Sequence, residues 1–191
     1  MIREAWYAIT PQSSTVEWWK IGWFPRSIPK HCFCIWLTFC EAHRTLNKMV
    51  RWGLVPINRC EFICGQGESI DHFFFECTFI ARIWNHFLLL YRFRRRPSGW
   101  HVESEWCSQR LKGNDFKSWL TKLTLAAVIY HSWQERNNRL YNNFVRSFEC
   151  LVSGIGDNVV DKCRGLTQVD DNPTNRELLS NWNLQPILLT L

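Results

Sequence analysis

Three cysteines and one histidine lie close together near the middle of the chain. Cys60, Cys64, His72 and Cys77 form the run Cys-x3-Cys-x7-His-x4-Cys. Three thiolates and one imidazole complete the tetrahedral coordination of a structural Zn2+ and leave no position for water or substrate. The run therefore predicts a metal ion that stabilises a fold and performs no chemistry.

The alternative is that these residues are ordinary buried side chains, because free cysteine packs as a small apolar group. The spacing of the first two cysteines lies within the range of structural zinc sites, and Gly65 and Gly67 supply backbone freedom after such a turn. His72 and Cys77 can face one ion only if the helix between them is interrupted, since five steps of about 100° do not return to the same face. We therefore predict an interrupted helix before Cys77.

The other six cysteines have no histidine or cysteine at ligand spacing, and we interpret them as core or incidental thiols. They are Cys32, Cys34, Cys40, Cys107, Cys150 and Cys163. Nine cysteines cannot all pair, and the first ten residues lack an apolar secretory segment. We expect an intracellular protein of the nucleus or cytoplasm, with no membrane partner, since the apolar stretch at 87–91 is far too short to cross a bilayer.

A second group of residues with chemical potential is basic and aromatic. The run Tyr91-Arg92-Phe93-Arg94-Arg95-Arg96 alternates guanidinium groups with rings, and the chain from Arg82 to Lys112 has seven basic and two acidic residues, a local charge of +5. Arginines suit contact with phosphates, and Tyr91 and Phe93 could stack on bases. The alternative is a solubilising linker or an import signal. We expect weak, largely non-specific binding of RNA or DNA.

Helical periodicity must position both groups, and strand signals are scarce. The apolar spacing predicts helices over 29–43, 45–52 and 78–91, a longest helix capped by Asn114 or Asp115, and a last helix over 147–164. The fold class is thus mainly α, with a small irregular zinc-knuckle segment between helices and a helical carboxyl-terminal region. We divide the chain into a metal-binding domain (1–91), a basic linker (92–113), a helical region (114–166) and a loose tail (167–191).

Several short blocks follow one another along the first part of the chain: Arg3-Glu4-Ala5-Trp6, the aromatic stretch 18–24, Ile28-Pro29-Lys30-His31-Cys32-Phe33, Ile35-Trp36-Leu37, Arg51-Trp52-Gly53-Leu54 and His72-Phe73-Phe74-Phe75-Glu76-Cys77. In this order they resemble the reverse-transcriptase zinc-binding domain of plant LINE-type non-LTR retrotransposon polyproteins. Trp133-Gln134-Glu135-Arg136-Asn137 and Asn175-Arg176-Glu177-Leu178-Leu179 are similar to the segments that follow this domain. The family usually has Cys-x2-Cys where this chain has Cys60-x3-Cys64.

The resemblance implies a non-catalytic accessory to a retroelement reverse transcriptase, detached from polymerase and endonuclease parts that would lie upstream. It also implies contact with RNA or DNA and with the upstream polymerase part. The alternative is a metal-free helical remnant without present activity. We expect no enzyme, because Asp170 and Asp171 lie in a polar tail and His101-Val102-Glu103 lacks the second half of the zinc-deaminase signature.

Overall fold

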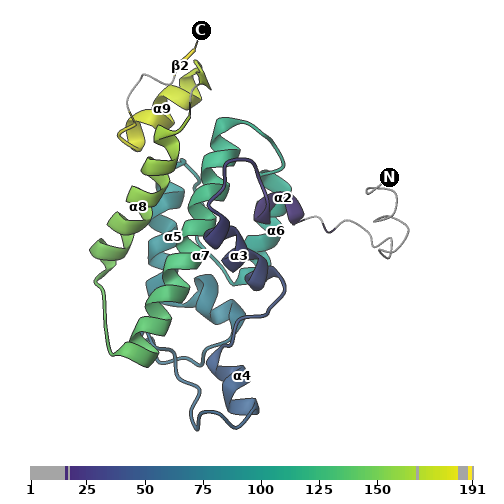
Figure 1. Ribbon diagram of the computed structural model, residues 1–191, viewed down its shortest axis with the longest axis vertical. Helices are drawn as coiled ribbons and strands as arrows, with labels where there is room; N and C mark the ends of the chain where they lie inside the picture. Colours follow the sequence, from purple (N-terminus) through teal and green to yellow (C-terminus); the bar gives the residue numbers. More distant parts are fainter. Residues whose placement is uncertain (1–15, 17, 167, 185–188, 191) are drawn as a thin grey trace.

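The computed structural model describes residue 16 and residues 18–166, 168–184 and 189–190, and within them the protein is mainly helical (Figure 1). The elements in chain order are α2 (Trp19–Gly22), α3 (Pro29–Phe39), α4 (Leu46–Arg51), the π-helical turn η1 (His72–Glu76), α5 (Thr78–Leu90), α6 (Trp100–Arg110), α7 (Phe116–Asn142), α8 (Phe148–Arg164), β1 (Val169–Asp170), α9 (Pro173–Asn181) and β2 (Leu189–Thr190). The mainly helical fold class is thus confirmed. The block Arg3-Glu4-Ala5-Trp6 lies outside the described residues.

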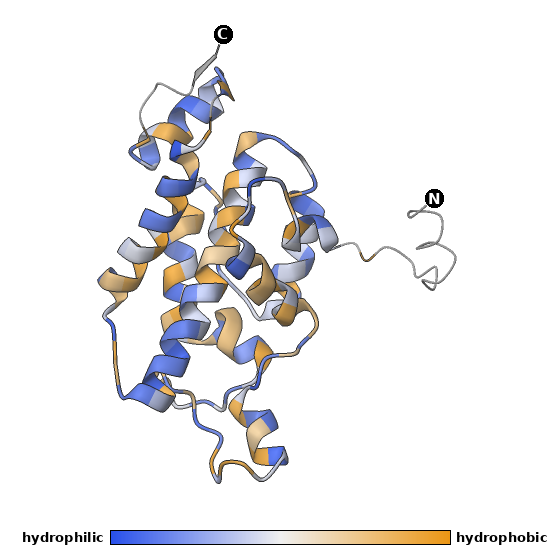
Figure 2. Cartoon of the chain, viewed as in Figure 1, coloured by the Kyte–Doolittle hydropathy of each residue, from blue (hydrophilic) through white to orange (hydrophobic). Residues whose placement is uncertain are grey.

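The long helix α7 is the centre of the fold, and α3, α5 and α8 pack against it (Figure 1). It begins where the carboxylate of Asp115 accepts a hydrogen bond from the N–H of Ser118, at 2.9 Å, as the sequence predicts. Its middle is apolar on every side, and Leu123, Ala127 and Val128 are fully buried. A helix with apolar residues all round belongs in the interior of a bundle. Figure 2 shows apolar segments of neighbouring helices turned toward α7.

The predicted helices form close to their expected bounds. Ser147 caps α8 by accepting a hydrogen bond from the N–H of Cys150. The first predicted helix is shorter than expected, because Glu41 has a left-handed backbone (φ 49°) that turns the chain away from α3 before His43. His43 then folds back, and its Nε2 lies 2.9 Å from the Thr38 hydroxyl. The turn therefore returns His43 to the core.

Helix α6 is absent from the sequence prediction, which assigned residues 92–113 to a linker. Its buried side is made by Trp100, Glu103 and Cys107. Because a carboxylate occupies the centre of that side, the apolar periodicity that indicates a helix is missing. Glu103 accepts hydrogen bonds from the indole N–H of Trp84, at 3.0 Å, and from the N–H of Ser98, at 2.9 Å. Glu103, a buried hydrogen-bonding residue, thus stands where an amphipathic helix usually has an apolar residue.

The segment that we expected to be a loose tail contains α9 and a parallel strand pair. Asn172 caps α9 by accepting from the N–H of Asn175, and Pro173 takes the first helical position. Trp182, just after α9, stacks on Phe87 of α5 at 5.6 Å. In the pair, Val169 lies opposite Leu189. The expectation of a loose tail is therefore wrong for these residues, and the Asn-Pro capping signal was present in the sequence.

Candidate metal centre

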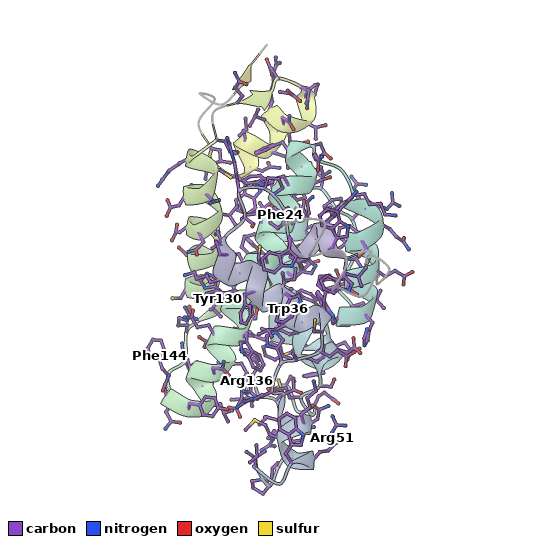
Figure 3. The ribbon with its side chains drawn as sticks, turned by 45° about the vertical axis from the view of Figure 1, so that its right-hand side comes forward. Phe24, Trp36, Arg51, Tyr130, Arg136 and Phe144 are labelled. Carbon is purple, nitrogen blue, oxygen red and sulfur yellow. The ribbon has the colours of Figure 1, made fainter. Side chains whose placement is uncertain are left out.

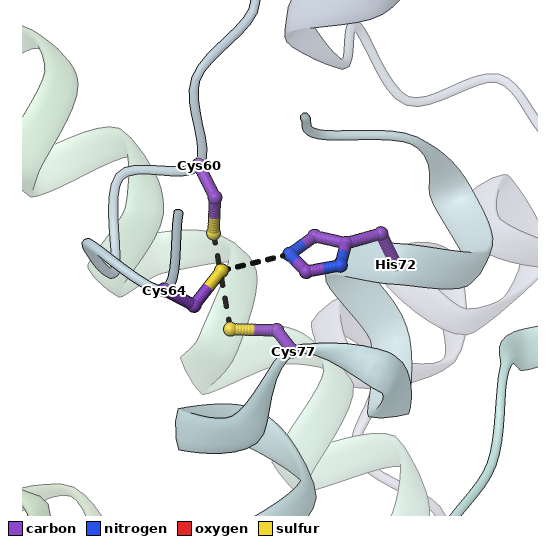
Figure 4. A group of neighbouring side chains, drawn as sticks. All are labelled: Cys60, Cys64, His72 and Cys77. Atoms are coloured by element: carbon purple, nitrogen blue, oxygen red, sulfur yellow. Dashed lines mark hydrogen bonds between the residues drawn. The ribbon is translucent and has the colours of Figure 1, made fainter. Parts of the chain in front are cut away.

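The four predicted metal ligands come together in the structure (Figure 4). One ligand atom from each of Cys60, Cys64, His72 and Cys77 lies within 4.8 Å of all the others. The Sγ atoms of Cys60 and Cys77 are 3.8 Å apart, and Cys64 Sγ lies 3.1 Å from His72 Nε2. Two sulfurs at about 2.3 Å from a tetrahedral zinc would be about 3.8 Å apart. The donor set and its spacing therefore fit a structural Zn2+.

The first two ligands stand on a tight turn that absorbs one residue more than a Cys-x2-Cys knuckle. The N–H of Ile63 donates to the carbonyl of Cys60 at 3.1 Å, and the N–H of Cys60 donates to the carbonyl of Gln66 at 2.9 Å. Gly65 has a φ of 84°, which confirms its predicted role in the turn. Ile63 also has a positive φ, 57°, and its side chain is 86% exposed. A β-branched residue is strained in this conformation, so the longer spacing has an energetic cost at Ile63.

The other two ligands face the same point because the helix between them is interrupted. Within η1, Phe74 has an extended ψ of 96° and Phe75 a positive φ of 86°. The N–H of Cys77 donates to the carbonyl of His72 at 2.6 Å, which closes the turn. The predicted interruption is therefore confirmed. Phe74 and Phe75 are buried, so packing holds the unusual backbone in place.

The local electrostatics favour a thiolate at Cys77. This residue caps the amino-terminal end of α5, and the backbone N–H groups of Phe79 and Ile80 point at its sulfur. A hydrogen bond from the Cys60 thiol, together with these N–H groups, lowers the pKa of Cys77. The same hydrogen bond and burial raise the pKa of Cys60. Because zinc binds thiolates, this shift in the pKa of Cys77 favours metal binding.

A buried ion pair connects the metal-ligand loop to α7. The guanidinium of Arg136 donates to both carboxylate oxygens of Glu68, at 2.7 and 3.1 Å, and both side chains are buried. Glu68 also accepts the N–H of Leu46, at 2.8 Å, and Arg136 donates to the carbonyl of Arg44. Four groups that would be costly to bury alone therefore satisfy one another. The loop between Cys64 and His72 is thereby fixed against both α4 and α7.

The neighbouring residue of α7, Glu135, makes a second buried centre. Its carboxylate accepts hydrogen bonds from Arg139 and Arg146, each at 2.8 Å, and from the N–H of Arg146. Arg139 also lies over the rings of Phe62 and Phe79, beside the metal ligands. Sequence reasoning noted Glu135 and Arg136 only as part of a resemblance. Both residues lie in a polar stretch of the sequence, 134–139, so no local pattern marked them as buried.

The six other cysteines do not join the cluster. Cys32, Cys34, Cys107 and Cys163 are buried, while Cys40 and Cys150 are exposed. Burial raises the pKa of Cys34 and of Cys163 to about 12, so both remain neutral thiols. Cys32, Cys34, Cys107 and Cys163 therefore behave as apolar core residues.

The predicted nucleic-acid segment is only partly available to a ligand. Tyr91 is fully buried, and its hydroxyl donates to the carbonyl of Leu120 at 3.0 Å. The expectation that Tyr91 stacks on a base is therefore wrong, because its ring belongs to the core. Phe93 is half-buried and packs edge-on against Trp106 at 5.0 Å. The remaining ring surface at Phe93 is small.

The four arginines of this segment differ in their surroundings. Arg95 forms an ion pair with buried Glu103 at 2.5 Å and lies over the ring of Trp106. Arg92 pairs with Glu177 at 2.6 Å on the surface. Arg94 and Arg96 are exposed, and neither forms an ion pair with any residue that the structure describes. An open hollow of ≈ 260 Å³ lies against this segment, lined by Arg92, Phe93, Arg94, Arg95, Trp106 and Arg110.

The protein has a closed Cys3His cluster between helices, which is the ligand set of structural zinc modules. Residues 1–84 match the model of the family described as zinc-binding in reverse transcriptase, and this segment includes all four ligands. The segment is thus similar to a reverse-transcriptase zinc-binding domain. Neither the curated proteins nor the solved structures gave a match to the chain. No helix among the described residues is long and apolar enough to span a membrane.

Proposed function

We propose that this chain is a non-catalytic zinc-binding module of a LINE-type retroelement polyprotein, in which Cys60, Cys64, His72 and Cys77 hold one Zn2+. The convergence of four ligand atoms within 4.8 Å carries the proposal. Zinc bound by these four residues would cross-link the turn at Cys60, the start of η1 and the start of α5. Four protein ligands leave no coordination position for a substrate, which supports a structural role.

The acidic pair Asp170 and Asp171 also supports a non-catalytic role. Asp171 is engaged by Arg176, whose Nη2 lies 2.6 Å from its carboxylate. The guanidinium lowers the pKa of this half-buried carboxyl and keeps it ionised. A carboxylate neutralised by its own neighbour on the surface is a poor metal ligand for nucleotidyl transfer.

We further propose that the hollow beside the arginine segment makes an accessory contact with RNA or DNA. Arg94 and Arg96 supply charge that the described part of the chain leaves unpaired, and Arg110 adds a third exposed cation. Such a surface neutralises phosphates and has no element placed to read base edges. The contact would therefore be weak and largely independent of sequence.

The test is binding of a labelled single-stranded oligonucleotide across a range of salt concentrations. Replacing Arg94 and Arg96 by Gln should weaken all sequences alike and lower the slope of log affinity against log salt by about 1.4, or 0.7 for each phosphate contact. Arg164→Gln is a matched control, because Arg164 is exposed on α8 and pairs only with the neighbouring Asp161 among described residues. Equal slopes for the wild type and the double variant would refute the contact.

A further inference from the structure

Among the residues that the structure describes, the segment 42–60, which includes α4, has several exposed large apolar side chains. Figure 3 shows α4, marked by the label of Arg51, standing away from the helical bundle. Trp52, Leu54 and Ile57 are 56%, 63% and 67% exposed. We refer to residues 42–60 as the α4 tip. Three large apolar side chains on one projection indicate a surface that meets a partner.

The α4 tip is also uniformly basic. It contains Arg44, Lys48, Arg51 and Arg59 and has no aspartate or glutamate. None of the four forms an ion pair with a residue that the structure describes, and only Lys48 is half-buried. The nearby carboxylate of Glu68 is buried and already paired with Arg136. The charge of the tip is therefore available to a polyanion.

The backbone fixes the position of the exposed tryptophan. Gly53, with a φ of 70°, ends α4; its N–H donates to the carbonyl of Val50, and the N–H of Leu54 donates to that of Met49, both at 2.9 Å. This pair of hydrogen bonds is a Schellman motif, which reverses the chain sharply. Trp52 lies at the reversal, and its ring contacts no other aromatic ring in the described part of the chain. A rigidly held indole that is 56% exposed suits stacking on a base.

The tip is joined directly to the metal centre. Arg59 precedes the ligand Cys60, and the side chain of Asn58 accepts a hydrogen bond from the N–H of Glu68 at 2.7 Å. A Cβ atom at position 67 would lie 2.8 Å from the side-chain amide of Asn58, so any residue larger than Gly67 would displace that amide. The loop 53–59 is thus held at Gly53 by the helix end and at Asn58 by the metal-ligand loop.

We propose that the α4 tip is a second nucleic-acid surface, on which Trp52 stacks with a base of a single strand while Arg51 and Arg59 contact its phosphates. This inference rests on the proposed function and extends it to residues outside the arginine segment. Charge complementarity selects a polyanion, and the free indole selects unpaired bases over a duplex. Leu54 and Ile57 extend the apolar surface beside the ring.

The test is fluorescence anisotropy with fluorescein-labelled 20-nucleotide RNA and DNA single strands, the matching duplexes and vesicles that contain phosphatidylserine. Trp52→Leu keeps an apolar side chain and removes the ring, so single-strand affinity should fall about 5- to 150-fold. Trp52→Phe should stay closer to wild type. Trp23→Leu is the control, because Trp23 is 48% exposed on a different part of the surface. Arg51→Gln with Arg59→Gln should lower the salt slope by about 1.4.

The pattern of losses among the variants separates this inference from the proposed contact at the arginine segment. If the wild type binds no oligonucleotide, both fail. If replacing Arg94 and Arg96 weakens binding while all tip variants bind normally, only the tip inference fails; the reverse pattern removes only the arginine segment. Equal losses for Trp52→Leu and Trp23→Leu, or for Trp52→Phe and Trp52→Leu, would exclude stacking at Trp52. Binding of vesicles without oligonucleotides would assign the tip to a membrane surface and overturn the proposal.

Discussion

Glu68 and Arg136 lie 68 positions apart in the sequence and form two hydrogen bonds, of 2.7 and 3.1 Å, in the protein interior. Glu68→Gln should lower the free energy of unfolding by about 3–5 kcal/mol, because it leaves the Arg136 guanidinium buried and unpaired. Arg92→Gln is the matched control, since it breaks the exposed pair with Glu177 and should cost less than about 1 kcal/mol. Chemical denaturation measures both. Similar losses in the two variants would show that the buried pair has no special weight.

The metal centre predicts one Zn2+ per chain. Cys77→Ser should release the metal and lower the helical signal in circular dichroism, because apparent binding energies of about 10–16 kcal/mol in zinc-finger peptides exceed the stability of many small domains. Cys150→Ser is the control, since Cys150 is exposed and lies outside the cluster. Elemental analysis of freshly folded, reduced protein decides the question. Metal-free wild-type protein with full helicity would instead favour a helical remnant without zinc.

The strained turn at Ile63 predicts a stabilising substitution. Asparagine tolerates the left-handed conformation that Ile63 adopts, so Ile63→Asn should raise the free energy of unfolding by about 1 kcal/mol. It should also raise zinc affinity, because the Cys60–Cys64 turn would be better pre-organised. The control is Ile57→Asn, which removes an exposed isoleucine without a positive φ. Equal effects of the two substitutions would mean that the gain comes from surface polarity and not from the backbone.

Two buried histidines predict loss of stability in acid. The rings of His31 and His131 lie 5.7 Å apart, and neither ring nitrogen of His31 has a hydrogen-bond partner among the described residues. Burial, with His131 and Lys30 nearby, lowers the pKa of His31 to about 3. Burial, with Arg146 and Lys30 nearby, lowers the pKa of His131 to about 4. Both are neutral in the folded state, whereas unfolded histidine titrates near 6.5.

The sign of this effect follows from proton binding. Below pH 6.5 the unfolded state binds more protons than the folded state, so stability is full above that pH and falls as the pH drops toward 4. At pH 5 each histidine should cost about 2 kcal/mol. His131→Phe should remove about one proton from the pH dependence of unfolding, measured against wild type over pH 4.5–7. Parallel curves for the two proteins would contradict the prediction, and the comparison cancels the shared effect of zinc loss.

Local patterns were enough to predict α3, α4, α5, α7, α8 and the ligand set, because these depend on near neighbours in the sequence. The interrupted helix at Phe74 and Phe75 followed from the requirement that His72 and Cys77 face one ion. Helix α6 was missed because its buried side contains Glu103, whose partners Trp84 and Arg95 lie elsewhere in the chain. Buried charges have no local signature.

The arginine segment shows the same limit. Its alternation of rings and guanidinium groups predicts a surface that is available throughout, yet Tyr91 enters the core and Arg95 pairs with Glu103. The exposure of a short basic run depends on the elements that pack against it, here α6 and α7. The composition of the run therefore indicates charge, and only the fold determines which charges face solvent.

Residue 84, where the similarity to the zinc-binding family ends, lies inside α5. The indole N–H of Trp84 has its acceptor on α6, at Glu103. A genetic exchange at that boundary would separate Trp84 from Glu103. It would also separate the amino-terminal turns of α5 from the rest of that helix. The downstream helices would thus be inherited together with the segment that carries the ligands. Selection for a stable zinc site would consequently extend to Glu103 and Arg136, far beyond the residues that touch the metal.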